Sequence, residues 1–457
     1  MGIQQIMLGT SPAGDTYWIK SDGVDTAGYK LEYNGVHVDT AGNVYTYGKT
    51  NDPWNTSNPW RYDRICFHKY DKHGTNVFYK RFSNNTNAQE PHYQHALVGL
   101  SDGSMIFTSR SNLASVKMNS SGSILHKKGY GTSSSSLDSN FTSISVNSSD
   151  QTLYTGYEAT YNSGTINVFQ INSNGTLAGD WQVSVTSSGN YGTGFNKTGT
   201  DSSGNVYIIG YRGQSGTYDK DGYIMKLNSS MVIQWQHTLG ETGYYPINQW
   251  YDLAFDSNDN IYCVGTARTS DRHYGWIVKY NSSGTLQWQK KFGNGTQNLY
   301  FWSISIDDDD NIYCQGSVDL YGSTPFWVKL NTSGAVQYQR DLRESNNNAN
   351  ADWTRTMTVS GDALYIVGRR YIGYQKHFGW IIKVPKAGID TGTYDNKYTI
   401  SQPSYTMSNT SFTTDRVSAP SFTIADVTNK NTYNATYSVS TNSNPGDIKS
   451  AYDIVDD

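Results

Sequence analysis

A short phrase that ends in an aromatic residue recurs along this chain at intervals of about fifty residues, a spacing typical of repeat architectures. Four clear copies have the pattern Asp-x-x-x-Asn-[Val/Ile]-Tyr, and three weaker copies keep the final aromatic residue. The seven final residues, here called the anchors, are Tyr45, Phe107, Tyr154, Tyr207, Tyr262, Tyr313 and Tyr365. Successive anchors are 62, 47, 53, 55, 51 and 52 residues apart. The chain therefore repeats one supersecondary unit seven times.

A second phrase falls between the anchors with the same count and phase. Its clear copies are MKLNSSMVIQWQ around Lys226, VKYNSSGTLQWQKKFG around Lys279 and VKLNTSGAVQYQ around Lys329. Looser copies occur around Lys69, Lys117, Gln170 and Lys383. The two phrases alternate seven times along the chain. Such regular alternation is not expected by chance.

Each repeat divides into four short strands. In one copy we expect strands over 253–255, 260–265, 276–280 and 285–290, because these runs alternate and are rich in Val, Ile, Tyr and Trp. The breaks are rich in Asn, Asp and Gly, which accept positive φ and form tight turns. The sequence predicts an all-β fold: a seven-bladed β-propeller with four-stranded antiparallel blades. The large residues at matching places in strand four should wedge between blades: Trp181, Trp235, Trp288 and Tyr338.

These phrases resemble the SBBP-type β-propeller repeat of bacterial and viral surface proteins, over about residues 30–390. The resemblance implies the fold and says little about function. Two repeats depart from the pattern, because Ser101 and Ser148 replace the first Asp of the turn. Separately, the first ten residues, MGIQQIMLGT, resemble the start of virion structural proteins of tailed phages. That second resemblance implies a virion protein.

The predicted organisation is an N-terminal arm over 1–24, the propeller over 25–400, and a Ser/Thr/Asn-rich C-terminal β extension over 401–457. The arm is expected to be a virion anchor or a strand that closes the ring. Two segments compete for that closing strand, Tyr17–Lys20 and Thr393–Ile400, and the sequence does not decide between them. Alternation in SFTIADV and TYNATYSVS predicts strands in the extension. The extension either packs on a neighbour, as an anchor or interaction segment, or is a partly ordered tail.

Composition excludes several partners and sites. The net charge is −4, from 35 basic and 39 acidic residues, with no basic stripe, so we expect no nucleic-acid partner. No run of about 18 apolar residues occurs, so we expect no membrane insertion. Cys66, Cys263 and Cys314 lie in apolar runs and should be buried without disulfides. No cofactor motif and no enzyme signature such as G-x-S-x-G or H-E-x-x-H is present.

The loops of the repeat predict where a ligand would bind. Turns between strands one and two and between strands three and four share one face and are short, whereas the loops of the opposite face are long and varied. We expect the ligand-binding residues on that long-loop face: Trp54, Trp60, Arg61, Arg212, Tyr218, Arg268, Arg272, His273, Tyr274, Tyr321, Arg369, Arg370, Tyr371 and Tyr374. Aromatic planes cover the C–H faces of sugars, and Arg reaches hydroxyls or carboxylates. The alternative is that these residues pack their own loops or contact a neighbouring subunit.

Two other sets of residues have alternative interpretations. The residues twelve positions before the anchors are mostly aromatic and are expected to plug the central channel, or else to line it for a ligand: Tyr33, His95, Thr142, Phe195, Trp250, Phe301 and Trp353. The acidic turn offers Asp307 and Asp309 as a weak calcium site, since hard cations take several oxygens. The turn position itself explains these carboxylates without a metal, and we expect none.

The leading hypothesis is a non-enzymatic phage virion structural protein on the particle surface, a propeller displayed on capsid or tail. Its partners would be other virion structural proteins and a host-surface polysaccharide. One alternative is an extracellular propeller glycosidase or lyase, which would need an acidic pair from different blades at the channel mouth. Another is a bacterial surface lectin, against which the absence of a signal-like N-terminus counts.

Overall fold

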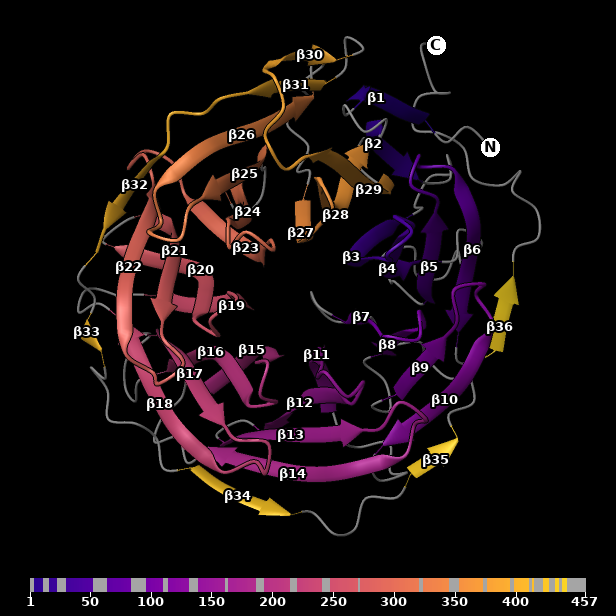
Figure 1. Ribbon diagram of the computed structural model, residues 1–457, viewed down its shortest axis with the longest axis vertical. Helices are drawn as coiled ribbons and strands as arrows, with labels where there is room; N and C mark the ends of the chain where they lie inside the picture. The colour runs from indigo at the N-terminus through magenta and orange to yellow at the C-terminus, as the bar shows by residue number, and fades with distance from the viewer. Residues whose placement is uncertain are drawn as a thin grey trace.

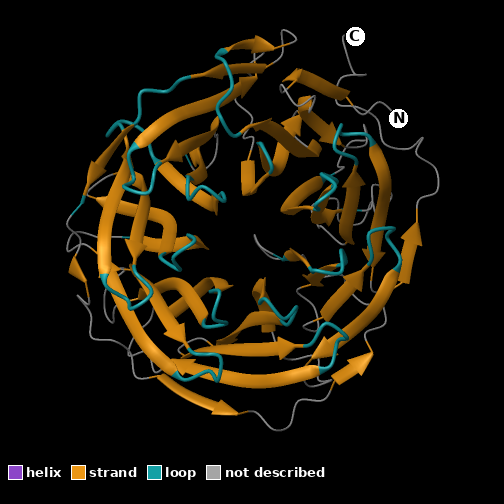
Figure 2. Cartoon of the chain, in the orientation of Figure 1, coloured by secondary structure: helices purple, strands orange, loops and turns teal. Residues whose placement is uncertain are grey.

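The computed structural model is a ring of seven antiparallel sheets arranged around a common axis (Figure 1). All described elements are strands, and Figure 2 shows no helix among them. The described residues therefore contain no helix long and apolar enough to cross a membrane. The predicted all-β, seven-bladed propeller with four-stranded antiparallel blades is confirmed. The structure describes residues 4–10, 16–22, 30–51, 64–83, 96–109, 114–130, 139–160, 163–185, 193–213, 220–240, 247–269, 272–319, 324–344, 353–372, 376–394, 398–410, 413–414, 422–426, 432–434 and 438–441.

Six blades are formed by four consecutive strands each, numbered from the axis outward. Blades 1 and 2 contain β3 (Leu31–Val38), β4 (Val44–Thr50), β5 (Arg64–Tyr70), β6 (Asn76–Ser83), β7 (Leu97–Gly99), β8 (Met105–Ser109), β9 (Ala114–Met118) and β10 (Ile124–Tyr130). Blades 3 and 4 contain β11 (Ser139–Val146), β12 (Thr152–Thr160), β13 (Ser163–Ile171), β14 (Leu177–Val185), β15 (Thr193–Thr200), β16 (Val206–Gly213), β17 (Lys220–Leu227) and β18 (Ile233–Gly240). Blades 5 and 6 contain β19 (Asn248–Phe255), β20 (Ile261–Thr269), β21 (Arg272–Tyr280), β22 (Leu286–Gly293), β23 (Leu299–Ile306), β24 (Ile312–Val318), β25 (Thr324–Leu330) and β26 (Val336–Glu344).

Blade 7 closes the ring by combining both ends of the repeat region. Its three inner strands are β27 (Trp353–Ser360), β28 (Ala363–Ile372) and β29 (Lys376–Pro385). The fourth strand is β2 (Thr16–Asp22) from the N-terminal arm, which pairs antiparallel with β29, so Trp18 lies opposite Lys383. Of the two competing segments, the one containing Tyr17–Lys20 is therefore the closing strand.

A fifth strand is added to the outer edge of every four-stranded blade. On blade 7 it is β1 (Gln4–Thr10), paired with β2. On the other six it comes from the chain after blade 7, from Tyr398 onward, three residues before the predicted start of the C-terminal extension. This part of the chain runs backward around the ring from blade 6 to blade 1 (yellow in Figure 1). These strands, here called the belt, are β31 (Tyr398–Ser401), β32 (Thr406–Asn409), β33 (Thr413–Thr414), β34 (Phe422–Asp426), β35 (Thr432–Asn434) and β36 (Ser438–Thr441). A short strand, β30 (Gly392–Tyr394), flanks β31.

The hydrophobic core lies between neighbouring blades. One buried cluster joins Tyr262 and Ile277 of blade 5 to Cys314 and Val328 of blade 6. This arrangement follows from the sequence, because both faces of each sheet are apolar and stacking covers both. The three cysteines are buried, as expected.

The aromatic residues before the anchors take part in this core, so the prediction that they plug a channel is wrong where the structure describes them. Tyr33, Phe195, Trp250 and Phe301 are all buried. Their neighbours are in the preceding blade: the Trp250 ring lies against Gly222 and the Phe301 ring against Gly275. A side chain at these glycines would collide with the ring, so the sequence pairs an aromatic residue in one blade with a glycine in the other. His95 and the side chains of Thr142 and Trp353 lie outside the described residues.

Candidate functional site

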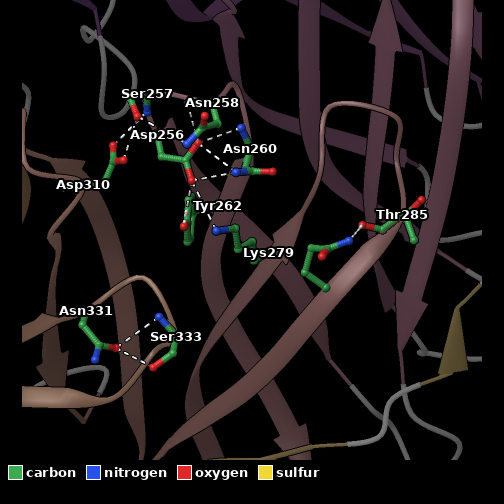
Figure 3. A network of polar contacts seen from close by, with 11 residues as sticks. Asp256, Ser257, Asn258, Asn260, Tyr262, Lys279, Thr285, Asp310, Asn331 and Ser333 are labelled. Atoms are coloured by element: carbon green, nitrogen blue, oxygen red, sulfur yellow. Dashed lines mark hydrogen bonds and ion pairs between the residues drawn. The ribbon is translucent and has the colours of Figure 1, made fainter.

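The topology gives the propeller two unlike faces. The short-turn face carries the turns between strands one and two and between strands three and four, and the long-loop face carries the remaining connections. On the short-turn face the turn between strands one and two is organised around one aspartate in blades 1, 4, 5 and 6. In blade 5, Asp256 Oδ1 accepts hydrogen bonds from the Asn258 and Asn260 backbone N–H groups at 3.0 and 2.9 Å (Figure 3). Its Oδ2 accepts from the Tyr262 hydroxyl at 3.0 Å and lies 3.3 Å from Lys279 Nζ.

This arrangement, here called the turn unit, explains the recurring phrase. The anchor tyrosine hydroxyl binds the aspartate, and the strand-three lysine covers the tyrosine ring, with Lys279 Nζ 4.8 Å from the Tyr262 centroid. Equivalent 3.0 Å hydrogen bonds are donated by the hydroxyls of Tyr45, Tyr207 and Tyr313. The acceptors are Asp39, Asp201 and Asp307, respectively. The polar side chains of the phrase therefore stabilise the turn by binding one another.

Adjacent turn units are linked across the blade boundary. Ser257 donates from its backbone N–H and its hydroxyl to the two carboxylate oxygens of Asp310 in blade 6, at 2.8 and 2.7 Å (Figure 3). Ser202 and Asp259 form the same pair between blades 4 and 5. The wedges predicted in strand four complete this contact, because the Trp235 ring packs on Gly284 of the next blade and Tyr338 bonds the Lys386 carbonyl oxygen at 3.0 Å.

The turn unit also explains the carboxylates of Asp307 and Asp309, which the sequence offered as a weak calcium site. Asp307 accepts from the backbone N–H of Asp309 at 3.1 Å and from Asn311 and Tyr313, and it lies 3.3 Å from Lys386 Nζ. Its oxygens are directed at these donors. Within the described ranges, no group of three or more His, Cys, Asp or Glu side chains is placed to hold a metal ion.

The long-loop face is built differently, starting from a β-bulge in the innermost strands. In six blades the pairing of strands one and two shifts by one residue near the long-loop end of strand one. The residues inserted at the bulges of blades 1, 4, 5, 6 and 7 are Asn34, Asn196, Tyr251, Trp302 and Arg355. A bulge re-aims its side chain out of the regular alternation. Because they occupy equivalent places on the innermost strands, these residues form a row around the propeller axis. The residue types in this row vary around the ring.

Four rings of blades 5 and 6 form a continuous cluster in this row, here called the aromatic arc: Tyr251, His273, Tyr300 and Trp302. The Tyr251 and Trp302 centroids are 4.7 Å apart, and Trp302 stacks on Tyr300 at 5.4 Å. Tyr300 in turn lies 4.9 Å from His273. Tyr300 is buried, while the other three rings are partly exposed.

Polar groups hold the arc in place. Trp302 Nε1 donates to Ser317 Oγ at 2.7 Å, and the Gln249 amide donates to the Tyr251 hydroxyl. The His273 backbone N–H donates to Asn298 Oδ1 at 3.0 Å. Burial, assisted by the nearby Arg268, lowers the pKa of His273 to about 4, so its ring is neutral at physiological pH. The arc is thus a fixed set of uncharged rings with hydrogen-bonding edges.

A charged cluster continues the row into blades 7 and 1. Glu32 is fully buried, and its carboxylate oxygens lie 2.7 Å from Arg355 Nε, 2.9 Å from Arg369 Nη1 and 3.8 Å from Lys49 Nζ. Burial alone would raise the pKa of Glu32, but Arg355, Lys49 and Arg369 together hold it well below its usual value. Glu32 is therefore ionised and cannot serve as a proton donor near neutral pH.

The structure brings only part of the predicted site together. Arg268 and His273 lie in or beside the aromatic arc, Arg272 is exposed at the start of the same strand as His273, and Arg369 belongs to the charged cluster.

Three other predicted residues point elsewhere. Arg212 lies beside Tyr223 and Asp221. The Tyr274 ring packs on Gly293 under Lys291, and Arg370 covers the ring of Tyr398 in the belt at 5.6 Å. The backbone of Tyr371 pairs with His377 in the sheet, and its side chain lies outside the described part of the structure. The remaining predicted residues lie outside the described ranges: Trp54, Trp60, Arg61, Tyr218, Tyr321 and Tyr374.

Sequence reasoning missed the bulge residues although a signal for them existed. The row Asn34, Asn196, Tyr251 and Trp302 lies eleven residues before the corresponding anchors, one position after the row proposed to plug the channel. A regular strand would alternate the two rows between opposite faces. Only knowledge of the bulge shows that the second row leaves the regular alternation, while the first row is buried.

Comparisons with known proteins found similarity among solved structures. No model of a protein family matches the chain, and neither does any curated protein sequence. Similar solved structures include a streptogramin B lyase, with 10% identity over 80% of this chain and 98% of the other and a TM-score of 0.46. The virginiamycin B lyase of Staphylococcus aureus has 11% identity over 80% and 99%, with a TM-score of 0.48. The polysaccharide lyase Uly1 has 9% identity over 77% and 89%, with a TM-score of 0.45. Such similarity carries no argument about activity, substrate or partner.

Proposed function

We propose that this chain is a non-enzymatic binding protein that holds a glycan on its long-loop face. The observation that carries the proposal is the aromatic arc, in which Tyr251, Trp302 and His273 present partly exposed rings from neighbouring blades. Aromatic faces cover the apolar C–H surface of a sugar ring, and the surrounding amide and guanidinium groups reach its hydroxyls. Rings that are already fixed by Ser317 and Gln249 lose little freedom on binding.

The setting that we propose is the surface of a phage virion, where other virion structural proteins would be the partners and a host-surface polysaccharide the ligand. Support for this setting comes from the resemblance of residues 1–10 to the start of tailed-phage virion proteins. In the fold, most of that segment is β1, the fifth strand of blade 7. An attachment to the virion would therefore have to involve the outer edge of blade 7 or the segments beyond the belt.

The carboxylates near the axis favour binding over catalysis. Glycosidases use two carboxyl groups that flank the scissile bond, one of them protonated. Glu32 is ionised beneath three cations. Burial raises the pKa of Asp252, but its Oδ2 accepts from Ser303 Oγ at 2.8 Å and from the Ile304 N–H at 3.0 Å, inside the contact between inner strands. Among the described residues, both carboxyl groups are held by cations or hydrogen-bond donors.

A glycan-binding measurement tests the proposal. The purified protein should bind saccharides on a glycan array, and Trp302→Ala should weaken binding by tenfold or more, equivalent to about 1.4 kcal/mol. Val232→Ala, which removes an exposed side chain on the short-turn face, is the matched control and should bind like the parent. Binding that is unchanged in Trp302→Ala, or turnover of a bound polysaccharide, would contradict the proposal. Mass spectrometry of purified particles tests the virion setting.

A further inference from the structure

The seam where blade 7 meets blade 1 differs in chemistry from two boundaries within the repeat region. At those two boundaries an aromatic ring lies over a glycine of the preceding blade, as Trp250 lies over Gly222 and Phe301 over Gly275. The residues that pair with the two glycines on strand four are fully buried and apolar: Leu239 and Phe292. The contact of ring, glycine and strand four is therefore apolar at both boundaries.

At the seam the same place is polar. The Tyr33 ring of blade 1 lies over Gly379 of blade 7, and the strand-four residue that pairs with Gly379 is Asp22. The Tyr33 hydroxyl donates to Asp22 Oδ2 at 3.0 Å, and the Tyr70 hydroxyl donates to the same oxygen at 2.6 Å. Asp22 is 1% exposed. A buried carboxylate bound by two tyrosines therefore stands where the other two boundaries have an apolar side chain.

Further polar contacts surround this carboxylate. The Tyr33 hydroxyl also lies 2.8 Å from the Tyr70 hydroxyl and 3.0 Å from His68 Nδ1. On β2, Lys20 donates to the Gly74 carbonyl oxygen of blade 1, and its Nζ lies 4.8 Å from the Tyr70 ring centroid. The closing strand thus brings two charged side chains into contact with blade 1.

This polar cluster is an expensive way to join two blades. Burial raises the pKa of Asp22, although Lys20 and the two hydroxyls act in the opposite direction. Asp22 Oδ1 and His68 Nε2 are buried and have no hydrogen-bond partner among the described residues. An apolar pair such as Trp250 and Leu239 fills the equivalent place without this desolvation cost. In coiled coils, a single polar position within a series of apolar contacts selects the partner and the register at a cost in stability.

We propose that Asp22, Tyr33 and Tyr70 form a closure key, which selects the N-terminal strand β2 as the fourth strand of blade 7 and rejects an apolar strand in its place. In the other six blades strand four follows strand three directly in the sequence, so chain connectivity supplies it. The edge of β29 has no such strand and is open to other extended segments, including the belt and the arm of a second copy. A strand without a carboxylate at this place would bury both hydroxyls without their acceptor. The inference does not depend on glycan binding.

Hydrogen exchange of the full-length chain measures how firmly the closure key holds β2. In Asp22→Leu the amides of β2 should exchange about tenfold faster or more than in the parent, while those of β17 and β18 keep their protection. Tyr70→Phe, which removes one of the two donors, should accelerate the same amides by a smaller factor. Ser21→Ala is the matched control and should exchange like the parent. Ser21 is the neighbouring residue of β2, is 2% exposed, and its hydroxyl has no hydrogen-bond partner among the described residues.

A peptide experiment tests the selection itself. In the Asp22→Leu chain, whose own arm is released, a labelled peptide of residues 16–22 should bind at the edge of β29. Fluorescence anisotropy should show about tenfold or tighter binding of the native peptide than of the same peptide with Asp22→Leu. Adding Tyr33→Phe and Tyr70→Phe to the chain removes both donors and should abolish this preference.

Each result supports or overturns the closure key. Exchange of β2 that is unchanged in Asp22→Leu overturns it, and so does equal binding of the two peptides or a preference that survives the loss of both tyrosine hydroxyls. If Asp22→Leu also loses the protection of β17 and β18, the comparison of Tyr70→Phe with Ser21→Ala decides. Faster exchange of β2 in Tyr70→Phe alone supports the key, and equal exchange in both variants overturns it.

Discussion

The blades and the belt that surrounds them are both antiparallel β-structure, yet different groups specify them. The blades are fixed by side chains: the Asp–Tyr contact of the turn unit, as in Asp256 and Tyr262, occurs in four blades, and rings such as Trp250 match a glycine in the preceding blade. The belt strands are two to five residues long and add to blade edges by strand pairing. Side-chain contacts leave a repeated pattern in a sequence, and backbone pairing leaves almost none. The two regions should therefore respond differently to truncation, acid and substitution.

Removal of the belt should have the largest effect. A chain that ends at Ser401 lacks β32 to β36 and leaves the outer strands of blades 1 to 5 unpaired, and it also loses Tyr405, which packs between Phe292 and Phe326. Exposed strand edges associate with other chains. We expect aggregation in light scattering and a melting temperature lower by about 10 °C or more. A chain that ends at Thr441 keeps all belt strands and is the control. Unchanged melting and a monomeric state after truncation at Ser401 would show that the blades need no belt.

Acid should act on the blades through several turn units at once. Although burial opposes it, hydrogen bonds from Asn and Tyr residues hold the pKa values of Asp39, Asp256 and Asp307 below their usual value. A carboxyl group with a lowered folded-state pKa stabilises the fold above its unfolded pKa, about 3.9, and that contribution disappears as pH falls through the folded pKa.

We therefore expect denaturant stability to decline below about pH 4. Burial raises the pKa values of Asp22 and Asp252, so these two groups act in the opposite direction, favouring the folded state as pH falls toward 3.9. Urea titrations between pH 3 and pH 7 measure the net change in the free energy of unfolding from both groups of carboxylates. The free energy of unfolding should decline less steeply with falling pH in Asp256→Asn, because asparagine does not titrate. A stability that is flat from pH 7 to pH 3 in the parent would contradict the role given to the turn units.

Much of the blade architecture could be predicted from the sequence because every element of it is repeated in side chains. The anchors and turn aspartates of blades 1, 4, 5 and 6 and the wedges at Trp235, Trp288 and Tyr338 are where the repeat places them. The anchors predicted for blades 2 and 3 are wrong by one residue, because Ile106 and Leu153 occupy the equivalent position opposite strand three. The belt was only partly predictable: the alternating runs SFTIADV and TYNATYSVS do contain β34, β35 and β36. Their pairing partners could not be predicted, since a strand that pairs through its backbone carries no mark of the edge it joins.

The long-loop face was predicted less well for a related reason. Loop composition pointed to Arg268, Arg272, His273 and Arg369, which the structure places in or near the aromatic arc and the charged cluster. Tyr251 and Trp302 were missed because a bulge shifts them out of the alternation that sequence reasoning assumes. A bulge depends on the whole blade pairing, so a single repeat read alone cannot show it.

A single turn unit should matter less than the belt and more than any exposed residue. Asp256→Ala removes the acceptor for two backbone N–H groups and the Tyr262 hydroxyl and leaves Lys279 without its 3.3 Å partner. Loss of this partly buried network should cost about 2–4 kcal/mol in the free energy of unfolding, measured by urea denaturation. Asp308→Ala, at an exposed place in the next blade's turn, is the control and should change stability by less than about 0.5 kcal/mol. An equal loss in both variants would mean that the aspartate acts through general charge and not through the turn unit.

The smallest effect should come from changing belt side chains while keeping the belt. Ser408 and Asn409 lie on β32 opposite Lys291 and Lys290 of β22, and both are exposed. The double variant Ser408→Ala, Asn409→Ala keeps every backbone group that pairs with β22, so we expect a change below about 0.5 kcal/mol in the free energy of unfolding. A loss of more than about 1 kcal/mol would show that side chains help to select the edge. If the small effect is found, the belt can change its sequence freely as long as its strands remain extended and spaced to reach successive blades. The same freedom would explain how a Ser/Thr/Asn-rich segment without a core of its own can still follow the ring blade by blade.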